Sequence, residues 1–284
     1  MAKIKDAEVR KPQAPRTHVP AKTGGVGMVR AVVFEIGQIF ELVAHVVRSA
    51  IRFPRGYWAD TRDEMYSLLR LCIVPAAFAM IGYGFLVTTF GVGLLLLLGA
   101  PNRMGGFWVM ADIRELSVFI TSMTVAGVIG TSITADIGAR RVREELDALQ
   151  VLGIDHIRLL VLPRVVATSL ATVLVQVFNV FVGTVLGLLG VMWLGNTSSG
   201  SYMDSMIHNL HTADLWGSLV KTLIIGFLIG VVCSHKGLTA GGGPEGVGRA
   251  VNQAVVICFA MVWIVNFFFN ATMQGLNPDL QNIR

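Results

Sequence analysis

The chain has 284 residues, of which 54% are apolar and only 14% are charged, and its mean hydropathy is +0.65. Ordinary soluble domains carry about 25% charged residues, and a soluble protein this apolar would expose much of its apolar surface and aggregate. The three cysteines show neither CxxC nor metal spacing, which excludes a disulfide framework and a zinc site. The composition therefore predicts an all-α integral membrane protein.

The net charge of +5 is concentrated at the start of the chain. Lysine and arginine crowd the first 22 residues, beside Pro12, Pro15 and Pro20. A basic, proline-rich segment with few apolar residues is typical of a disordered tail. Residues 1–28 are therefore predicted to be a disordered cytoplasmic tail, with anionic lipid headgroups rather than nucleic acid as its partner.

Residues 29–52 carry an amphipathic pattern. Their apolar residues recur at intervals of three and four, which places them on one helical stripe: Val32, Ile36, Ile39, Phe40, Val43, Val47 and Ile51. Too many charged residues occupy the other faces for this helix to cross a bilayer. The pattern predicts a helix lying in the membrane interface, with an ordinary helix packed on the protein as the alternative; both can hold together.

Five apolar runs follow and predict five transmembrane spans. They cover residues 68–99, 116–135, 159–194, 215–233 and 251–273. A straight span needs about 20 residues. The first run is longer than that and is interrupted by Pro75, so it is either one long, kinked span or a span plus a re-entrant segment.

Lysine and arginine in the short loops set the expected orientation. The connection 136–158 carries four arginines, whereas the connection 195–214 carries no Lys or Arg. This asymmetry predicts that the N-terminus and the connections 136–158 and 234–250 are cytoplasmic. The loop 100–114 and the C-terminus are then external.

The cytoplasmic connection 136–158 contains a predicted helix over residues 139–152. Apolar residues line one face at a three-and-four spacing: Val142, Leu146, Leu149 and Leu152. Two charged pairs are expected at i,i+4 on the remaining surface: Arg140 with Glu144, and Arg141 with Glu145. Gly153 is expected to end the helix. Such a helix is either a rigid docking element or an interfacial connector between two spans.

Two glycine-containing segments have packing or turn roles rather than chemical ones. In the second span, Gly127, Gly130 and Ser132 allow another helix to approach closely, within the protein or from a partner subunit. A second group of glycines predicts a cytoplasmic turn: Gly242, Gly243, Gly246 and Gly248. This turn is not a P-loop, because Arg249 and Ala250 follow where that motif needs Lys and Ser or Thr.

Other polar residues give weaker indications. His208 and His211 with Asp204 could bind a metal externally, but a solvated loop is the favoured interpretation, so no metal site is predicted. Lys221 lies near the start of the fourth span and is expected to snorkel to the surface, with a role near a substrate as the alternative. No catalytic constellation can be assembled on one side of the membrane, so the chain is not predicted to be an enzyme.

Several motifs together resemble the MlaE/YrbE permease family, the membrane subunits of ABC lipid transporters that work with Mce-domain proteins. The similar segments are 114–116 (Arg-Glu-Leu), 126–138, 144–149 (Glu-Glu-Leu-Asp-Ala-Leu), 152–155 (Leu-Gly-Ile-Asp) and 242–251. The resemblance covers roughly residues 50–275, within a predicted permease domain of 29–284. The sequence departs from the family pattern at Ser117–Val118, where members continue with Gly-Pro, and at Val128, where many have Arg.

The resemblance implies a function and partners. The helix 139–152 would be the coupling helix that sits in a groove of a cytoplasmic ABC ATPase, where ATP and Mg would bind; the chain itself would bind no cofactor. The residues expected at that contact are Arg140, Arg141, Glu144, Glu145, Leu146, Asp147, Leu149, Leu152 and Gly153. Mce-domain proteins would dock externally, and a second permease subunit would complete the core. The residues of these motifs are most similar to those of actinobacterial Mce permeases. Permeases of that group pair as two different chains, so the resemblance favours a heterodimer over a homodimer.

The expected function is thus a permease for phospholipid, fatty or mycolic-type lipid, or sterol, in the bacterial inner (plasma) membrane. The near absence of charged groups in the spans favours such cargo over an ion or a sugar. The alternative is a membrane scaffold or lipid scramblase that acts without nucleotide. A secondary transporter ranks third, because the spans show no inverted repeat.

Overall fold

The computed structural model describes residues 25–52, 56–195 and 198–277, and no strand occurs among them. By its internal contacts the chain divides into two units, Met1–Gln38 and Ile39–Arg284. The described part of the first unit, residues 25–38, is helical throughout. Most of the predicted tail 1–28 lies outside the described residues. Its last four residues begin a helix, so the prediction of a tail was wrong for them.

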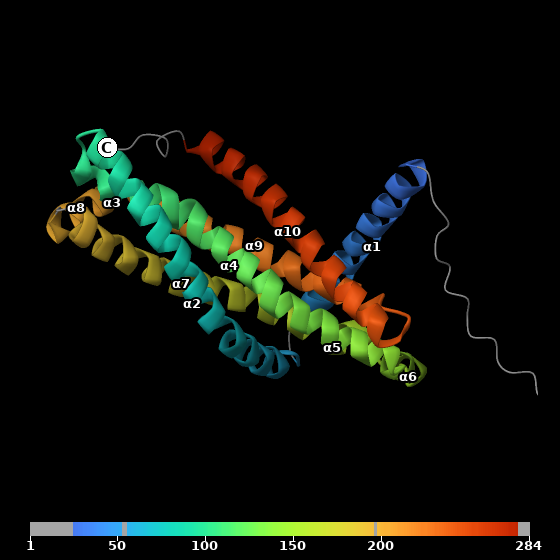
Figure 1. Ribbon diagram of the computed structural model, residues 1–284. Helices are drawn as coiled ribbons and strands as arrows, with labels where there is room; N and C mark the ends of the chain where they lie inside the picture. The colour runs from blue at the N-terminus through green and yellow to red at the C-terminus, as the bar shows by residue number, and fades with distance from the viewer. Residues whose placement is uncertain (1–24, 53–55, 196–197, 278–284) are drawn as a thin grey trace, which may run out of the picture. The chain divides into compact units, whose positions relative to one another are not determined.

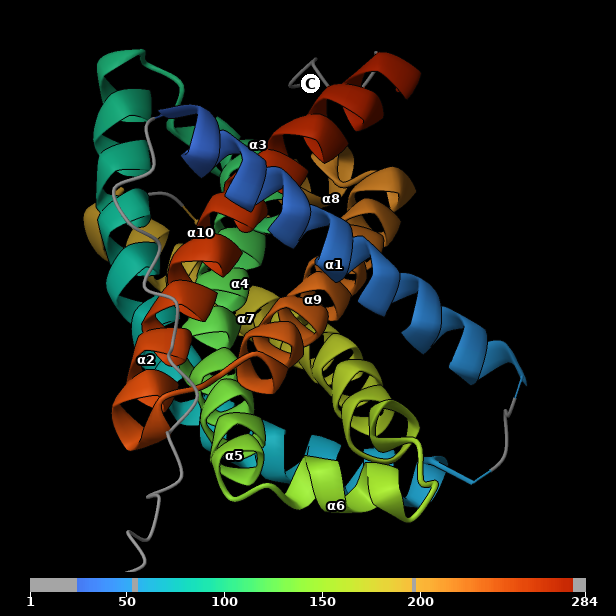
Figure 2. The ribbon, with the colours of Figure 1, turned by 90° about the vertical axis from the view of Figure 1, so that its right-hand side faces the viewer.

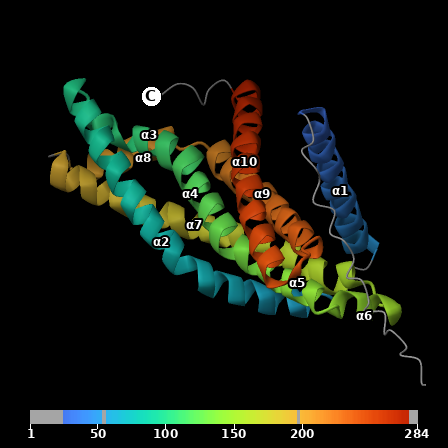
Figure 3. The same cartoon turned by 45° about the vertical axis from the view of Figure 1, so that its right-hand side comes forward.

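Five helical stretches are long and apolar enough to cross a membrane, which confirms the predicted number of spans. Figures 1 and 3 show them running alongside or across one another. They are Trp58–Leu97, Pro101–Val142, Ile157–Leu194, Thr212–Leu238 and Gly243–Leu276. The chain is therefore an all-α membrane protein. The short helices α6 (Glu145–Val151) and α8 (Ser199–Asn209) lie at opposite ends of the bundle, which are called the α6 end and the α8 end.

The first span is the single helix α2 (Trp58–Leu97), with Pro75 inside it. Of the two predicted alternatives, one long span is therefore confirmed. The alternative of a span plus a re-entrant segment was wrong. Figure 3 shows that α2 changes direction part-way along its length. Proline removes a backbone donor and crowds the preceding turn, which is the usual cause of such a bend.

The second span is helical from residue 101 onward, so the prediction of a loop over 100–114 was wrong, whereas its external position stays a prediction. Its elements are η1 (Pro101–Arg103), α3 (Met104–Trp108), η2 (Val109–Leu116), α4 (Ser117–Val125), η3 (Ala126–Gly130) and α5 (Thr131–Val142). The segments η2 and η3 have the wider π-helical turn. Wide turns of this kind are rare and often occur at functional sites. Here η2 carries Arg114 and Glu115, two charged residues of the second span.

The predicted helix 139–152 is broken in the middle. Residues up to Val142 continue the transmembrane helix α5, and α6 begins only at Glu145. Glu144 between them has φ 61°, a left-handed conformation that an L-residue rarely adopts and that ends a helix. Figure 2 shows α6 lying across the end of the bundle. The sequence pattern missed this break because glutamate is normally a good helix former.

The third and fourth spans are joined by a helix where a loop was predicted. The third span comprises η4 (Ile157–Val161) and α7 (Leu162–Leu194). The connection 195–214 then contains α8, whose start is capped by the Ser198 hydroxyl oxygen accepting from the Ser201 N–H at 3.2 Å. The fourth and fifth spans are α9 (Thr212–Leu238) and α10 (Gly243–Leu276).

Helices α7 and α9 meet at backbone contact. A Cβ added at Gly230 of α9 would lie 3.0 Å from the Cα of Val165, and one at Gly226 would lie 3.1 Å from the Cα of Ser169. Small residues allow such an approach, which is how helices associate in lipid. The Ser169 hydroxyl also donates to the Leu223 carbonyl at 2.9 Å. This crossing fixes α9, and with it the polar residues near the α8 end.

Helix α1 (Gly25–Arg52) covers the predicted amphipathic segment 29–52. Within the second unit, Leu42 and Val46 are buried against Val161 and Leu162 of the third span and Val231 of α9. The alternative of a helix packed on the protein is therefore confirmed for residues 39–52. Its position in the membrane interface stays a prediction, in keeping with the exposed side chain of Phe40.

Candidate functional site

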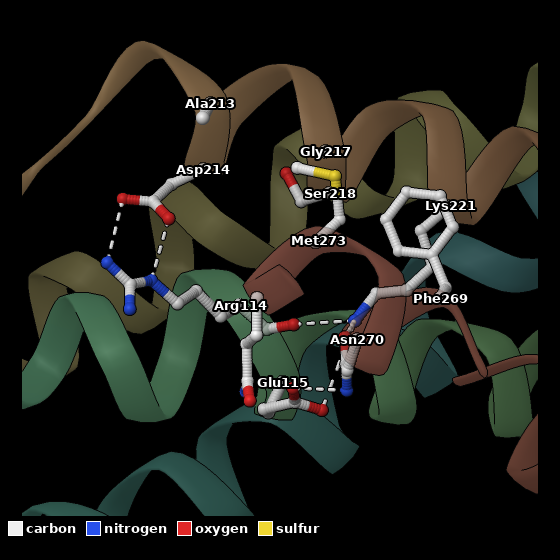
Figure 4. Close-up of a pocket in the computed structure, with 11 residues that line it drawn as sticks. Arg114, Glu115, Ala213, Asp214, Gly217, Ser218, Lys221, Phe269, Asn270 and Met273 are labelled. Carbon is white, nitrogen blue, oxygen red and sulfur yellow. Dashed lines mark hydrogen bonds and ion pairs between the residues drawn. The ribbon is translucent and has the colours of Figure 1, made fainter. Parts of the chain in front are cut away.

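A small cavity opens between η2, α9 and α10, toward the α8 end (Figure 4). Its volume is about 50 Å³. One water molecule needs about 10–15 Å³ of such space, so the cavity holds a few waters or the tip of a polar group. Polar and apolar side chains line it: Arg114, Glu115, Asp214, Ser218, Lys221, Phe269, Asn270, Met273 and Gln274.

Arg114 and Asp214 form the first ion pair of this site. The Arg114 Nε lies 2.7 Å from Asp214 Oδ1, and Nη2 donates to Oδ2 at 3.1 Å. The Asp214 side chain is 1% exposed. Its carboxylate also accepts from the His211 backbone N–H at 3.0 Å and so caps α9. A bidentate pair of this kind fixes both side chains in orientation.

Lys221 is buried between α9, α10 and η2 rather than directed to the surface. Its Nζ donates to the Arg114 backbone carbonyl at 2.8 Å and to Asn270 Oδ1 at 2.9 Å. The nearer Glu115 carboxylate oxygen lies 3.9 Å away. The predicted snorkelling of Lys221 was therefore wrong, because these oxygens replace the water that its ammonium group would otherwise seek.

Glu115 is held by two asparagines of α10. Asn266 Nδ2 donates to Glu115 Oε2 at 2.9 Å, and Asn270 Nδ2 donates to Oε1. Asn270 therefore bridges Lys221 and Glu115 with its two amide atoms. The Glu115 side chain is still 43% exposed, so the carboxylate is accessible from the cavity side. The four charged side chains and two amides form one connected polar site, most of which is visible in Figure 4.

Sequence reasoning did not assemble this site. Arg114 and Glu115 were noted only as part of a motif, and Lys221 only as a single lysine in an apolar run. About 100 residues separate them along the chain, and no periodicity connects positions in different spans. A usable signal was present, since ionisable residues inside spans normally face protein partners and mark functional sites.

A second charged cluster lies toward the α6 end. Arg164 of α7 contacts Glu64 of α2, with Nε 3.3 Å from Oε1, and also forms an ion pair with Asp136 of α5. Asp136 in turn contacts Arg140 Nε at 3.3 Å. The Arg164 side chain is 11% exposed. This cluster ties three spans together close to the start of α6.

The residues expected at an ATPase contact lie in and around α6. The predicted pairs Arg140–Glu144 and Arg141–Glu145 were wrong because of the break at Glu144. The ion pairs formed instead are Arg143–Glu145 at 2.7 Å, Arg140–Glu145 at 4.0 Å, and Arg141–Asp147. Leu146 is buried and anchors α6, Leu149 is half-buried, and Leu152 is 72% exposed. Gly153 follows the helix with φ 72°.

Asp155 organises the turn that leads from α6 into the third span. Its Oδ1 accepts from the backbone N–H of Ile157 at 3.0 Å and of Arg158 at 3.4 Å, and its Oδ2 lies 3.3 Å from His45 Nε2. Partial burial raises the pKa of Asp155, but His45 and the two backbone donors outweigh this, so the pKa lies below its ordinary value. The contact links α1 to the chain just after α6.

The small residues of the second span divide between two roles. A Cβ added at Gly130 would lie 2.8 Å from the Cys233 sulfur, so this glycine serves packing of η3 against α9 inside the chain. A Cβ at Gly127 would meet nothing within 4 Å, and Ser132 is exposed. Gly127 and Ser132 thus lie on a surface where another helix can approach. A permease interface there stays a prediction.

The predicted glycine-rich turn is shorter than expected. Gly242 and Gly243 adopt left-handed φ values of 84° and 75°. Gly246 and Gly248 lie inside α10, which begins at Gly243, so the prediction of a turn was wrong for them. A Cβ at Gly246 would lie 1.6 Å from the Gly241 carbonyl oxygen, which explains why only glycine fits there.

His208 and His211 do not form a cluster with a metal-binding geometry. His208 Nε2 lies 3.4 Å from Asp204 Oδ1 on the exposed surface of α8, whereas His211 lies beside Asp214 at the start of α9. Among the residues that the structure describes, no group of three His, Cys, Asp or Glu side chains could hold a metal ion.

Comparison with known proteins adds to this geometry. Residues 61–272 match the model of a family described as Permease MlaE. The chain is 30% identical over 249 residues to a probable ABC transporter permease protein of Synechocystis, covering 86% of this chain and 90% of that protein. It is 32% identical over 216 residues to a probable ABC transporter permease protein of Rickettsia typhi, covering 70% and 82%.

A third relative comes from a plant. The chloroplast protein of Arabidopsis thaliana named Trigalactosyldiacylglycerol 1 is 31% identical over 239 residues, covering 82% of this chain and 67% of that protein. The family match spans well over half of the chain and includes both charged clusters. The chain therefore belongs to the MlaE permease family.

Proposed function

We propose that the chain is the permease subunit of an ATP-driven lipid transporter that works with a separate cytoplasmic ATPase and Mce-domain proteins. The observation that carries this proposal is α6. It is a short, charged helix between two spans, anchored by buried Leu146 and exposing Leu152 and Val151 away from the bundle. A helix that is packed on its own protein through one residue and exposes apolar side chains at its C-terminal end is suited to docking into a groove on another protein.

The ATPase supplies the energy in this scheme, and ATP and Mg bind there. Family membership and the names of the relatives support a transport subunit, since two of them are called probable ABC transporter permeases. The basic residues around α6 favour a cytoplasmic location for its end of the bundle by the loop-charge rule. The α8 end and the C-terminus are then external, where Mce-domain proteins dock, and the location is the bacterial plasma membrane.

Lipid is the proposed cargo. Apolar spans suit acyl chains, and the polar site of Arg114, Glu115, Asp214 and Lys221 lies toward the end of the bundle where a headgroup would enter from the external side. The name of the Arabidopsis relative includes a glycolipid, which supports lipid as the class of cargo. Motion of the ATPase is transmitted to the spans through α6 and through the Arg164 cluster, which consists of Arg164, Glu64, Asp136 and Arg140.

A second permease subunit completes the lipid path. Gly127 and Ser132 leave the second span open to a close helix–helix contact. The proposed partner is a related chain, giving a heterodimer, with a homodimer as the alternative.

The test is affinity purification of the tagged full chain in mild detergent, with mass spectrometry of retained proteins and lipids. Recovery of an ATPase, a second permease and Mce-domain proteins in defined ratio supports the proposal. Recovery of the chain alone, even after gentle crosslinking, contradicts it and favours a scaffold or scramblase that needs no nucleotide.

A variant sharpens the test. The charge inversion Glu144→Lys with Glu145→Lys should abolish recovery of the ATPase while the chain stays in the membrane. Glu245→Lys is the matched control, because Glu245 is an exposed glutamate with an i,i+4 partner, Arg249, in α10 near the same end. Retention of the ATPase by the double variant would show that α6 is not its docking element.

A further inference from the structure

The charges in the cavity cancel within the protein. Four charged side chains line it: the cations Arg114 and Lys221 and the carboxylates Glu115 and Asp214. Each cation has a carboxylate partner, at 2.7 Å for Arg114–Asp214 and at 3.9 Å for Lys221–Glu115. The lining of the cavity therefore carries no net charge and offers no excess positive charge to an anionic ligand.

Both cations also direct N–H donors at oxygens of the protein. The Arg114 guanidinium presents its bidentate edge to Asp214. An ammonium group has three N–H donors. The Lys221 Nζ donates to the Arg114 carbonyl and to Asn270 Oδ1, and the Glu115 carboxylate lies within ion-pair distance at 3.9 Å. An incoming phosphate or carboxylate would have to displace these oxygens.

Acceptors, in contrast, are in surplus. The Glu115 carboxylate accepts from Asn266 and Asn270 and is still 43% exposed. The Asn266 Oδ1, buried beside it, has no donor among the described residues. The orientation of the Asn266 amide is set by its Nδ2, which donates to the Glu115 carboxylate. A site with an exposed carboxylate acceptor, and with cations already paired to carboxylates, favours a ligand that brings its own hydrogen-bond donor, such as a hydroxyl group.

We propose that this pocket selects lipids whose polar end is an uncharged, hydroxyl-bearing group and rejects lipids that end in a phosphate monoester. The inference rests on the proposed lipid-transport function and names the class of lipid. A phosphate would approach the carboxylates of Glu115 and Asp214 without a free cation to offset the repulsion between like charges. A hydroxyl donates to Glu115 at no such cost, and the cavity of about 50 Å³ has room for it.

The experiment compares two lipids with identical acyl chains, dioleoylglycerol and dioleoyl phosphatidic acid. The purified full chain is incubated in detergent with equal amounts of both, and the retained lipids are quantified by mass spectrometry. The wild-type protein should retain the diacylglycerol over the phosphatidic acid by about tenfold or more, a difference of one decade in affinity. Glu115→Gln leaves the Lys221 cation without its carboxylate and should shift the ratio toward phosphatidic acid by about tenfold.

Glu64→Gln, which removes a carboxylate from the Arg164 cluster, is the matched control and should keep the wild-type ratio. If Glu115→Gln does not fold, Asp214→Asn serves as the second variant, because it removes the carboxylate charge paired with Arg114. Equal retention of the two lipids by the wild type, or an unchanged ratio in the folded variants, would overturn the selectivity while leaving lipid transport intact. Retention of neither lipid by the wild type would count against the proposed function itself.

Discussion

Asp214 holds Arg114 with both oxygens of its carboxylate, Oδ1 at 2.7 Å from Nε and Oδ2 at 3.1 Å from Nη2. The pair joins the start of α9 to the π-turn η2. Arg114 is 19% exposed and Asp214 1% exposed, so neither charge is well hydrated. The relationship gives the polar site its geometry, because the carbonyl of Arg114 is also a ligand of the Lys221 ammonium group.

Removing one partner of this pair should be costly. Arg114→Gln leaves a buried carboxylate unpaired and should lower the free energy of unfolding by about 3–5 kcal/mol. Asp214→Asn should cost less, since asparagine can still accept from the His211 N–H at the start of α9. Denaturant titration of both variants and of the double variant in detergent measures the coupling. Strictly additive effects would show that the two charges do not stabilise each other.

The ion pairs of Arg164 with Glu64 and Asp136, near the α6 end, predict which substitution destabilises the chain most. Arg164→Gln should be the most destabilising change, because it leaves Glu64 and Asp136 close together with their shared cation removed. Asp136→Asn and Glu64→Gln each leave Arg164 one carboxylate and should cost about 1–2 kcal/mol less than Arg164→Gln. Thermal unfolding of the three variants gives the order. A smaller effect for Arg164→Gln than for either carboxylate variant contradicts the arrangement.

The break between α5 and α6 depends on one strained residue. Glu144 has φ 61°, a conformation that costs a non-glycine residue about 1–2 kcal/mol. Glu144→Gly should therefore stabilise the chain by about 1 kcal/mol, less the added chain entropy of glycine in the unfolded state. Glu144→Ala serves as the control, since it removes the carboxylate and keeps the strain. Equal stability of the two variants would indicate that the turn is not strained.

Two glycines of the second span predict opposite outcomes. A Cβ at Gly105 would lie 2.1 Å from the Tyr202 carbonyl oxygen, so Gly105→Ala should force α3 and α8 apart and cost about 1–3 kcal/mol. A Cβ at Gly127 meets nothing within 4 Å, and Gly127→Ala should be neutral or stabilising by up to about 1 kcal/mol in the isolated chain. Melting temperatures test both. If Gly127 lies in a permease interface, size-exclusion chromatography should show a weakened assembly for Gly127→Ala.

Asp155 predicts a dependence on pH. Because the pKa of Asp155 is lowered in the folded chain, its contacts with His45, Ile157 and Arg158 favour the ionised form. Their contribution to stability is complete above the ordinary aspartate pKa of about 3.9 and is lost as the pH falls through the lowered value. The stability difference between wild type and Asp155→Asn should shrink on acidification. A difference that is constant from neutral to acidic pH would show that the ionised form is not favoured by folding.

Much of the fold was predictable from the sequence because the bilayer imposes a simple rule. A chain that crosses a membrane needs apolar runs of a certain length and must form its backbone hydrogen bonds internally. Both requirements act on contiguous residues. The five spans follow from this, whereas α1 and the charged helix near residue 146 follow from the three-and-four spacing of their apolar residues. Motifs such as 144–149 also sufficed to indicate the MlaE family, which the comparisons confirmed.

The details that depend on contacts between distant segments were decided only by the tertiary structure. The partners of Lys221 lie on η2 and α10, and hydropathy cannot show that they replace water around its ammonium group. The tight packing at Gly105 is likewise set by contact with α8, and the left-handed conformation of Glu144 is not what the local helix propensity of glutamate predicts. Apolar patterning specifies which residues enter the membrane, whereas the positions of its few polar groups relative to one another require the packed helices.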